Sequence, residues 1–364
     1  MIREILNIIL VLVFVSLISL YLKISAKHKT YPSPCPVFGP GSAEPRNVTT
    51  FLTNLGFAVR SVLDSGQRVV VYTTVNAEAA TNNLPHFLTS CAKVSPSLIP
   101  NVIIFCLDSS ACRLCESAHP VIRCVHMDLG VSGGSLAPGV GDQTEKDYWR
   151  LTYGRVFATL KIHSFNISVL TVDVDSVFFR NPLAPGEAIA KRPNDIALVT
   201  DRKQFNIQVR DKSVANGGFI YFPATTPRTT SETREIINRI WSHSCFPSKS
   251  EQMVTSKVLR DYYQESVAKG KTFSPSVLSK SHYLSYCNTD CNNSNFSSIT
   301  SVKELQKMEK SFTGQPNERA CRPNNRRQWV FFHMACIAWP HGRSEELSAA
   351  KGQSQQAMLE WVAA

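Results

Sequence analysis

The feature that most constrains the fold of this 364-residue chain is a repeated alternation of short apolar runs and longer segments with helical spacing. The runs at 68–73, 101–105 and 121–125 are rich in Val and Ile, and helical segments such as 54–63 and 77–90 flank them. Short continuous apolar runs are typical of strands that are buried on both faces. The alternation therefore predicts a mostly parallel sheet covered by helices.

The same pattern continues through the middle of the chain. A helix is expected at 145–162, followed by a strand at 167–172. Further strands are expected at 195–199 and 218–222, and a helix at 231–241. A chain of this length accommodates one large domain. The predicted fold class is α/β, with a mixed, mostly parallel sheet flanked by helices.

The N-terminal segment is apolar over a longer stretch. As a helix with about 1.5 Å rise per residue, residues 5–22 would span roughly 27 Å, enough for a thin bilayer. We interpret 1–4 as a short cytoplasmic tail and 5–22 as a transmembrane signal-anchor. A cleaved signal peptide is the alternative, because the small residues at 24–26 would suit cleavage. The Pro-rich residues 23–49 are expected to form an extended stem.

Two features of the sequence give opposite indications of the orientation of this anchor. The basic residues that follow the span outnumber those before it, which favours a cytosolic C-terminal part. Eleven cysteines and four Asn-x-Ser/Thr sequences favour the lumen. We predict a single-pass type II protein of the Golgi or endoplasmic reticulum membrane, with the part of the chain after the anchor in the lumen. The candidate N-glycosylation sites are Asn47, Asn166, Asn292 and Asn295.

Closely spaced cysteines allow two interpretations. Cys112, Cys115 and Cys124, and also Cys287 with Cys291, have spacings at which thiolates can share a zinc ion. No second tight pair follows at a finger-like distance, so disulfide bonds are favoured over zinc. Their connectivity is not readable from the sequence.

The net charge of +11 indicates an affinity for polyanions, among which nucleic acid, anionic lipid and phosphorylated donors are candidates. The densest basic cluster, at 325–327, is too short for a nucleic-acid-binding arm. We therefore expect no nucleic-acid partner.

Two aspartates follow the predicted strand at 167–172. Asp173 and Asp175 must be solvated, paired or bound to a metal ion, because an isolated charge is too costly to bury. Ligands in open α/β sheets bind at the carboxyl ends of the strands. An Asp-x-Asp pair there can hold Mg²⁺ or Mn²⁺, which in turn bridges donor phosphates. The competing interpretation is a solvated turn before residues 178–182.

The stretch 169–182 around these aspartates resembles the signature of nucleotide-diphospho-sugar transferases with a GT-A fold, in particular the domain family of plant arabinosyl- and xylosyltransferases. The resemblance extends over 68–343. It implies a GT-A catalytic domain at 50–343. The polar residues 344–364 that follow are expected to form a surface helix or a C-terminal tail. It also implies a glycosyltransferase that moves a sugar from a nucleotide-sugar donor, a UDP-sugar, to a glycan or glycoprotein acceptor.

The resemblance assigns roles to further residues. His333, at the end of an apolar run, would complete the metal site of Asp173 and Asp175, with Mn²⁺ or Mg²⁺ as the cofactor. On pattern alone, a lone His in such a run is more often a core residue. The implied donor-binding residues are Thr74, Asn76, Arg155, Asn216 and Gly217, and the implied sugar- or acceptor-binding residues are Glu251 and Gln252.

Each of these assignments has a structural alternative. Arg155 would also fit a solvated helix face, and Asn216 and Gly217 would fit an ordinary turn before a strand. Glu251 and Gln252 would fit the first turn of a helix, where the helix dipole favours an acidic residue. The resemblance implies retention of anomeric configuration, which needs no dedicated general base. An inverting reaction would require one, with Asp201 and Glu251 as candidates.

Two rival functions use the same residues. In a haloacid-dehalogenase-like phosphatase, Asp173 would be the nucleophile and Asp175 the general acid or base. Such a domain begins with this strand, whereas a long α/β segment precedes it here. A transferase-like lumenal binding protein without turnover is the second rival.

Overall fold

The computed structural model describes most of the region after residue 43. The described ranges are 44–94, 96–131, 142–200, 215–243, 251–271, 273, 275–278, 283–285, 303, 330–333 and 344–363. The predicted anchor at 5–22 lies outside these ranges. Among the residues that are described, no helix combines the length and the apolar character needed to cross a bilayer.

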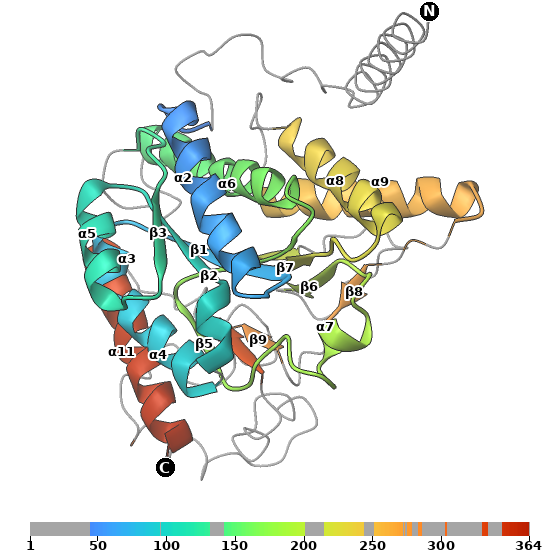
Figure 1. Ribbon diagram of the computed structural model, residues 1–364. Coiled ribbons are helices and arrows are strands. Elements are labelled where there is room, and N and C mark those ends of the chain that lie inside the picture. The colour runs from blue at the N-terminus through green and yellow to red at the C-terminus, as the bar shows by residue number, and fades with distance from the viewer. Residues whose placement is uncertain are drawn as a thin grey trace, which may run out of the picture. The chain divides into compact units, whose positions relative to one another are not determined.

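A seven-stranded sheet forms the centre of the molecule, in the order β3-β2-β1-β4-β7-β6-β8 (Figure 1). The strands β1 to β4 are parallel to one another. β7 is antiparallel to both of its neighbours, β4 and β6, and β8 is parallel to β6. The predicted mixed, mostly parallel sheet is confirmed. The strands are β1 (Val69–Val75), β2 (Val102–Cys106), β3 (Arg123–His126), β4 (Ser168–Val172), β6 (Ala197–Thr200), β7 (Ala215–Phe222) and β8 (Ser276–Val277).

Helices cover both faces of this sheet (Figure 1). On one face lie α2 (Val48–Asp64), α6 (Asp142–His163), α8 (Pro227–Trp241) and α9 (Glu251–Ala268). On the other lie α3 (Ala77–Asn82), α4 (Leu84–Val94), α5 (Ser109–Ala118), the short α7 (Ala188–Lys191) and the 3₁₀ turn η1 (Pro96–Asn101). The last helix, α11 (Ser344–Ala363), packs on α3 and α4.

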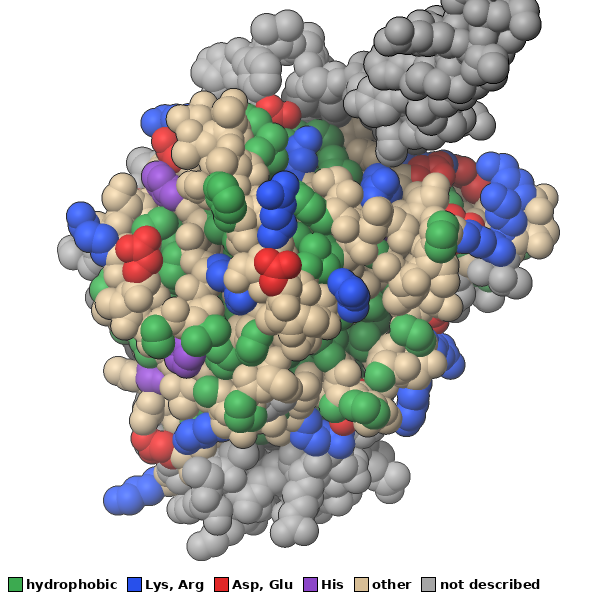
Figure 2. Space-filling model, in the orientation of Figure 1, with side chains coloured by type: hydrophobic (Ala, Val, Ile, Leu, Met, Phe, Trp, Pro, Cys, Tyr) green, Lys and Arg blue, Asp and Glu red, His purple; other side chains and the backbone are tan. Residues whose placement is uncertain are grey.

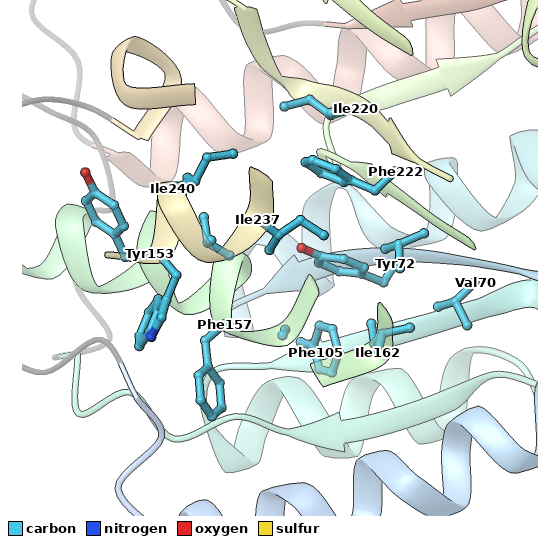
Figure 3. Close-up of a cluster of buried hydrophobic side chains, with 14 of the residues drawn as sticks. Val70, Tyr72, Phe105, Tyr153, Phe157, Ile162, Ile220, Phe222, Ile237 and Ile240 are labelled. Atoms are coloured by element: carbon cyan, nitrogen blue, oxygen red, sulfur yellow. The ribbon is translucent and has the colours of Figure 1, made fainter. Parts of the chain in front are cut away.

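Side chains of the central strands alternate between the two cores, as successive residues of a strand must. Val70 and Tyr72 of β1 point into the core under α6 and α8, whereas Val71 and Val75 belong to the opposite one. Figure 3 shows the ring of Tyr72 among aliphatic and aromatic side chains from the neighbouring elements. Its hydroxyl donates to the carbonyl of Arg155 at 2.8 Å, which ties β1 to α6.

A second, three-stranded sheet has the order β5-β10-β9. It consists of β5 (Ser176–Phe178), β10 (Phe331–His333) and β9 (Tyr283–Ser285). The ring of Phe331 contacts those of Phe178 and Phe219 at centroid distances of 5.5 and 4.6 Å. These aromatic contacts seat the small sheet against the large one.

The structure corrects three predicted boundaries. The helix expected at 77–90 is two helices, because Pro85 has no amide hydrogen with which to continue the first one. Residues 48 and 49, expected at the end of the stem, belong to α2, which Asn47 caps. The surface helix or tail expected at 344–364 is the helix α11, and its buried residues Met358 and Leu359 make it part of the domain.

The surface over α2, α6 and α8 carries basic and acidic side chains interspersed with polar ones (Figure 2). On this face the positive charge of the chain is therefore distributed rather than gathered into one stripe.

Candidate active site

Asp173 and Asp175 lie where the chain leaves the large sheet and enters the small one. Asp173 follows the last residue of β4, and its amide donates to the carbonyl of Gly218 on β7 at 3.1 Å. Asp175 directly precedes β5. The side chains are 28 % and 12 % exposed, respectively. Both carboxylates are thus partly withdrawn from water and need partners.

His333 reaches these carboxylates from β10. The antiparallel pairing of β10 with β5 sets His333 opposite Ser176, the neighbour of Asp175. Its Nε2 lies 3.1 Å from Asp173 Oδ2 and 3.2 Å from Asp175 Oδ1, and the side chain is 2 % exposed. The structure therefore brings together the three residues that the resemblance assigned to the metal.

The side-chain atoms of these three residues are of the types that coordinate divalent metal ions. One ligand atom of each of Asp173, Asp175 and His333 lies within 4.8 Å of the other two. Carboxylate oxygens with one imidazole nitrogen suit Mn²⁺, and carboxylates also suit Mg²⁺. Without an ion, burial lowers the pKa of His333, but Asp175 and Asp173 oppose this and raise it to about 10. Burial likewise raises the pKa of Asp175, but Lys351 and His333 hold it well below its usual range.

Arg155 is turned toward the same site from α6. Its Nη1 donates to Asp173 Oδ1 at 2.5 Å, and its Nη2 donates to Thr171 Oγ1 and to the carbonyl of Gly217. Burial would lower the pKa of Arg155, but Asp173 raises it above its ordinary value. These contacts contradict the alternative interpretation, in which Arg155 lies on a solvated helix face. In this structure the guanidinium positions Asp173, and contact with donor phosphates remains a prediction.

Lys351 is a site residue that the sequence interpretation did not identify. It lies on α11, and its Nζ donates to Asp175 Oδ2 at 2.6 Å. Gln355 of the same helix donates to the carbonyls of Val174 and Ser176. The only local signal is the spacing of buried residues within 344–364, which would have indicated a packed helix but not this contact.

The predicted donor-binding residues Thr74 and Asn76 lie at the end of β1, beside β4 at the same edge of the sheet. Asn76 caps α3, because its Oδ1 accepts a hydrogen bond from Ala79 N at 2.9 Å. Asn216 Oδ1 accepts from Gly218 N at 2.6 Å. Both asparagines thus have local structural roles, and their roles toward a donor remain predictions.

Gly217, Glu251 and Gln252 meet where α9 begins. A Cβ atom added at Gly217 would lie 3.1 Å from Glu251 Oε2 and 3.2 Å from Gln252 Cγ. Burial raises the pKa of Glu251, against the effect of Arg155. Arg155, Gly217 and Glu251 also line a small cavity between α6, α8 and α9. Asp201, the other candidate base, lies outside the described residues.

The cysteines support the disulfide interpretation in part. Cys115 of α5 is bonded to Cys124 of β3, whereas Cys112 and the buried Cys106 are free thiols. Cys287 and Cys291 lie outside the described residues. Of the four candidate glycosylation sites, Asn47 and Asn166 are exposed. Asn292 and Asn295 lie outside the described residues.

The fold and the site together define an α/β protein with a candidate divalent-metal centre at the carboxyl end of a central strand. The sequence model of the nucleotide-diphospho-sugar transferase family matches residues 97–316. The chain therefore belongs to this family of nucleotide-sugar-dependent glycosyltransferases. The match includes Asp173, Asp175 and Gly217, whereas His333 and Lys351 lie beyond it.

Three glycosyltransferases are among the solved structures that match this chain. The apo structure of the bifunctional WbbM has a TM-score of 0.41 and 12 % identity; 74 % of this chain is covered, and it spans 46 % of that protein. Mouse xyloside xylosyltransferase 1 has a TM-score of 0.37 and 9 % identity; the match covers 75 % of this chain and 99 % of that protein. The galactosyltransferase LgtC, in complex with donor and acceptor sugar analogs, has a TM-score of 0.38 and 12 % identity; the match covers 78 % of this chain and 95 % of that protein. No curated protein matches this chain significantly.

Proposed function

We propose that this chain transfers a sugar from a nucleoside-diphosphate donor, a UDP-sugar, to a glycan or glycoprotein acceptor, with Mn²⁺ or Mg²⁺ as cofactor and with retention of configuration. The observation that carries the proposal is the convergence of Asp173, Asp175 and His333 at the carboxyl end of β4. Membership of the transferase family supports the same reaction class and argues against the phosphatase interpretation.

The roles of the residues follow from their positions. Asp173, Asp175 and His333 would hold the ion, which when bound neutralises charge on the departing nucleoside diphosphate. Arg155 fixes Asp173 from the other side. Thr74 and Asn76 would bind the nucleoside, since β1 ends beside β4. Asn216 and Gly217, with Glu251 and Gln252, would bind the donor sugar or the acceptor.

The decisive experiment is a donor screen on the purified protein with Mn²⁺ present, which follows nucleoside diphosphate release and sugar transfer. We expect Asp175→Asn to lower transfer at least about 100-fold, because the variant loses a direct ligand and even outer-shell changes cost about 10–100-fold in metal affinity. Asp261→Asn is the matched control, since Asp261 is an exposed partner of Lys257 on α9.

The outcomes separate the rival functions. Full transfer by Asp175→Asn would remove the metal role proposed for this residue. Hydrolysis of simple phosphomonoesters without nucleotide release would favour the phosphatase. Donor binding without turnover on a broad panel would favour a binding protein. The anomeric configuration of the product, read by NMR, tests retention.

We also propose that the domain is lumenal and is anchored in the Golgi or endoplasmic reticulum membrane by residues 5–22. The Cys115–Cys124 disulfide supports an oxidising compartment. At Asn47 and Asn166 the side-chain oxygen accepts the hydrogen bond from Thr50 N and from Arg234, respectively. This leaves the amide nitrogen, which carries an N-glycan, outside these contacts. A smaller glycosidase-sensitive mass shift in the Asn47→Gln, Asn166→Gln double variant than in wild type would support the proposal, and a wild-type chain without glycans would contradict it.

A further inference from the structure

The four carboxylate oxygens of Asp173 and Asp175 fall into two classes. The outer pair is held by basic side chains: Arg155 Nη1 lies 2.5 Å from Asp173 Oδ1, and Lys351 Nζ lies 2.6 Å from Asp175 Oδ2. The inner pair, Asp173 Oδ2 and Asp175 Oδ1, lies 3.1 and 3.2 Å from His333 Nε2. Each carboxylate therefore presents one oxygen to the imidazole and the other to a cation of the chain.

We propose that Lys351 is a positioning residue that makes Asp175 a one-oxygen ligand and thereby sets the ion preference of the site. The inference rests on the proposed function, because it concerns the ion which that function requires. Arg155 plays the corresponding part for Asp173. With both outer oxygens held, the cluster offers two carboxylate oxygens and one imidazole nitrogen.

Lys351 is held in place by contacts of its helix on both sides of Asp175. Gln355, one turn further along α11, donates from Nε2 to the carbonyls of Val174 and Ser176 at 2.8 and 2.9 Å. Its Oε1 accepts from Asn83 Nδ2 at 3.0 Å. α11 thus fixes the backbone that flanks the carboxylate, and Lys351 fixes the carboxylate itself.

The close packing of α11 against the end of α3 depends on a glycine. A Cβ atom at Gly352 would lie 2.2 Å from the carbonyl oxygen of Asn82, so no other residue fits there without moving the helix. Ser348 Oγ donates to Asn83 Oδ1 at 2.8 Å on the same side. The side chain of Lys351 is 19 % exposed, so its pair with Asp175 is screened less than one on the open surface.

The number of available oxygens discriminates between ions. Ca²⁺ takes six to eight oxygen ligands and commonly uses both oxygens of a carboxylate, whereas smaller ions such as Mg²⁺ require near-octahedral geometry with fewer protein ligands. An ammonium group on Asp175 Oδ2 removes one oxygen that Ca²⁺ would otherwise use. Lys351 is therefore expected to disfavour Ca²⁺ relative to Mn²⁺.

The test measures ion preference on the full chain without nucleotide. Bound Mn²⁺ is followed by electron paramagnetic resonance while Ca²⁺ is added as the competitor. We expect the Ca²⁺ concentration that displaces half of the Mn²⁺ to fall at least about tenfold in Lys351→Met, the lower end of the range for outer-shell changes. Lys351→Arg, which keeps a cation beside Oδ2, should stay close to wild type. Lys257→Met, an exposed lysine of α9, is the matched control.

Each outcome decides a different point. An unchanged Ca²⁺ to Mn²⁺ preference in Lys351→Met, with Mn²⁺ still bound, overturns the inference and leaves the proposed function intact. If that variant does not fold, as judged by circular dichroism, the same ratio in Lys351→Gln decides instead. A wild-type chain that binds no Mn²⁺ overturns the proposed function together with the inference.

Discussion

Gly218 shows how strictly a single residue limits this site. A Cβ atom at this position would lie 2.2 Å from His333 Cε1 and 2.5 Å from its Nδ1. Because the histidine side chain is 2 % exposed, the ring has little room to move. The geometry of the ligand set therefore depends on the absence of a side chain on the facing strand.

We expect Gly218→Ala to displace the imidazole and to lower Mn²⁺ affinity at least about tenfold, as the loss of ligand positioning does in other metal sites. Calorimetric titration of the ion-free protein checks this. Gly56→Ala is the control: it lies in α2, and its Cβ would meet only the Phe165 ring at 3.8 Å. That variant should bind Mn²⁺ normally and gain up to about 1 kcal/mol of stability. Unaltered binding by Gly218→Ala would contradict the argument.

His163 makes the stability of the domain depend on pH. It is fully buried at the end of α6, and its Nε2 lies 2.9 Å from the carbonyl of Pro223. Burial, opposed by this hydrogen bond and assisted by Arg234, lowers its pKa from 6.5 to about 4. The folded state therefore holds His163 neutral where the unfolded chain already binds a proton.

Because only the unfolded chain binds this proton, the free energy of unfolding is highest above pH 6.5 and falls as the pH decreases toward 4. Between pH 7.5 and pH 5 the free energy of unfolding should fall by about 2 kcal/mol more in wild type than in His163→Gln, which cannot titrate. Urea unfolding at the two pH values measures the difference. Equal losses in both proteins would show that other groups cause the pH dependence.

The site residues were predictable to the extent that their signal is local. Asp173 and Asp175 follow an apolar strand and carry a motif, and His333 ends an apolar run. Lys351 has no such signal, because its partner Asp175 lies 176 residues away in the sequence. A contact of that range depends on how α11 packs, which no short pattern encodes.

At the scale of elements, strands with continuous apolar runs were predicted well. β1, β2 and β4 lie within a few residues of the expected ranges. The antiparallel direction of β7 was not predicted, because strand direction depends on the connections rather than on side-chain pattern. β5, at 176–178, was not predicted, because it has only three residues, too few for any periodicity.

The disulfide between α5 and β3 allows a prediction at this scale. Cys115 and Cys124 are separated by nine positions, and closing a loop of that size restricts the unfolded chain. The double variant Cys115→Ala, Cys124→Ala should lose about 2–3 kcal/mol of unfolding free energy. Chemical denaturation measures the loss, and reduction of the wild type should reproduce it. A double variant as stable as wild type would show that the bond adds nothing to the folding of this edge.

At the scale of the whole molecule, ion binding should stabilise the entire domain. An ion that binds only the folded state adds about 2.7 kcal/mol at a concentration of 100 times its Kd. We expect Mn²⁺ to raise the thermal midpoint of wild type and of Asp261→Asn, and to leave that of Asp175→Asn unchanged. An equal rise in all three proteins would indicate ion binding elsewhere.

The three candidate metal ligands lie where the two sheets of the molecule meet. Asp173 and Asp175 lie in the short link between β4 and β5, and His333 ends the strand β10 that pairs with β5. A bound cation would thus crosslink the two sheets, which are hydrogen-bonded separately. Loosening of the small layer should consequently appear first as weaker cation retention, before any change in secondary structure. Cation affinity would then report on how firmly the small sheet packs against the large one, as well as on the chemistry of the site.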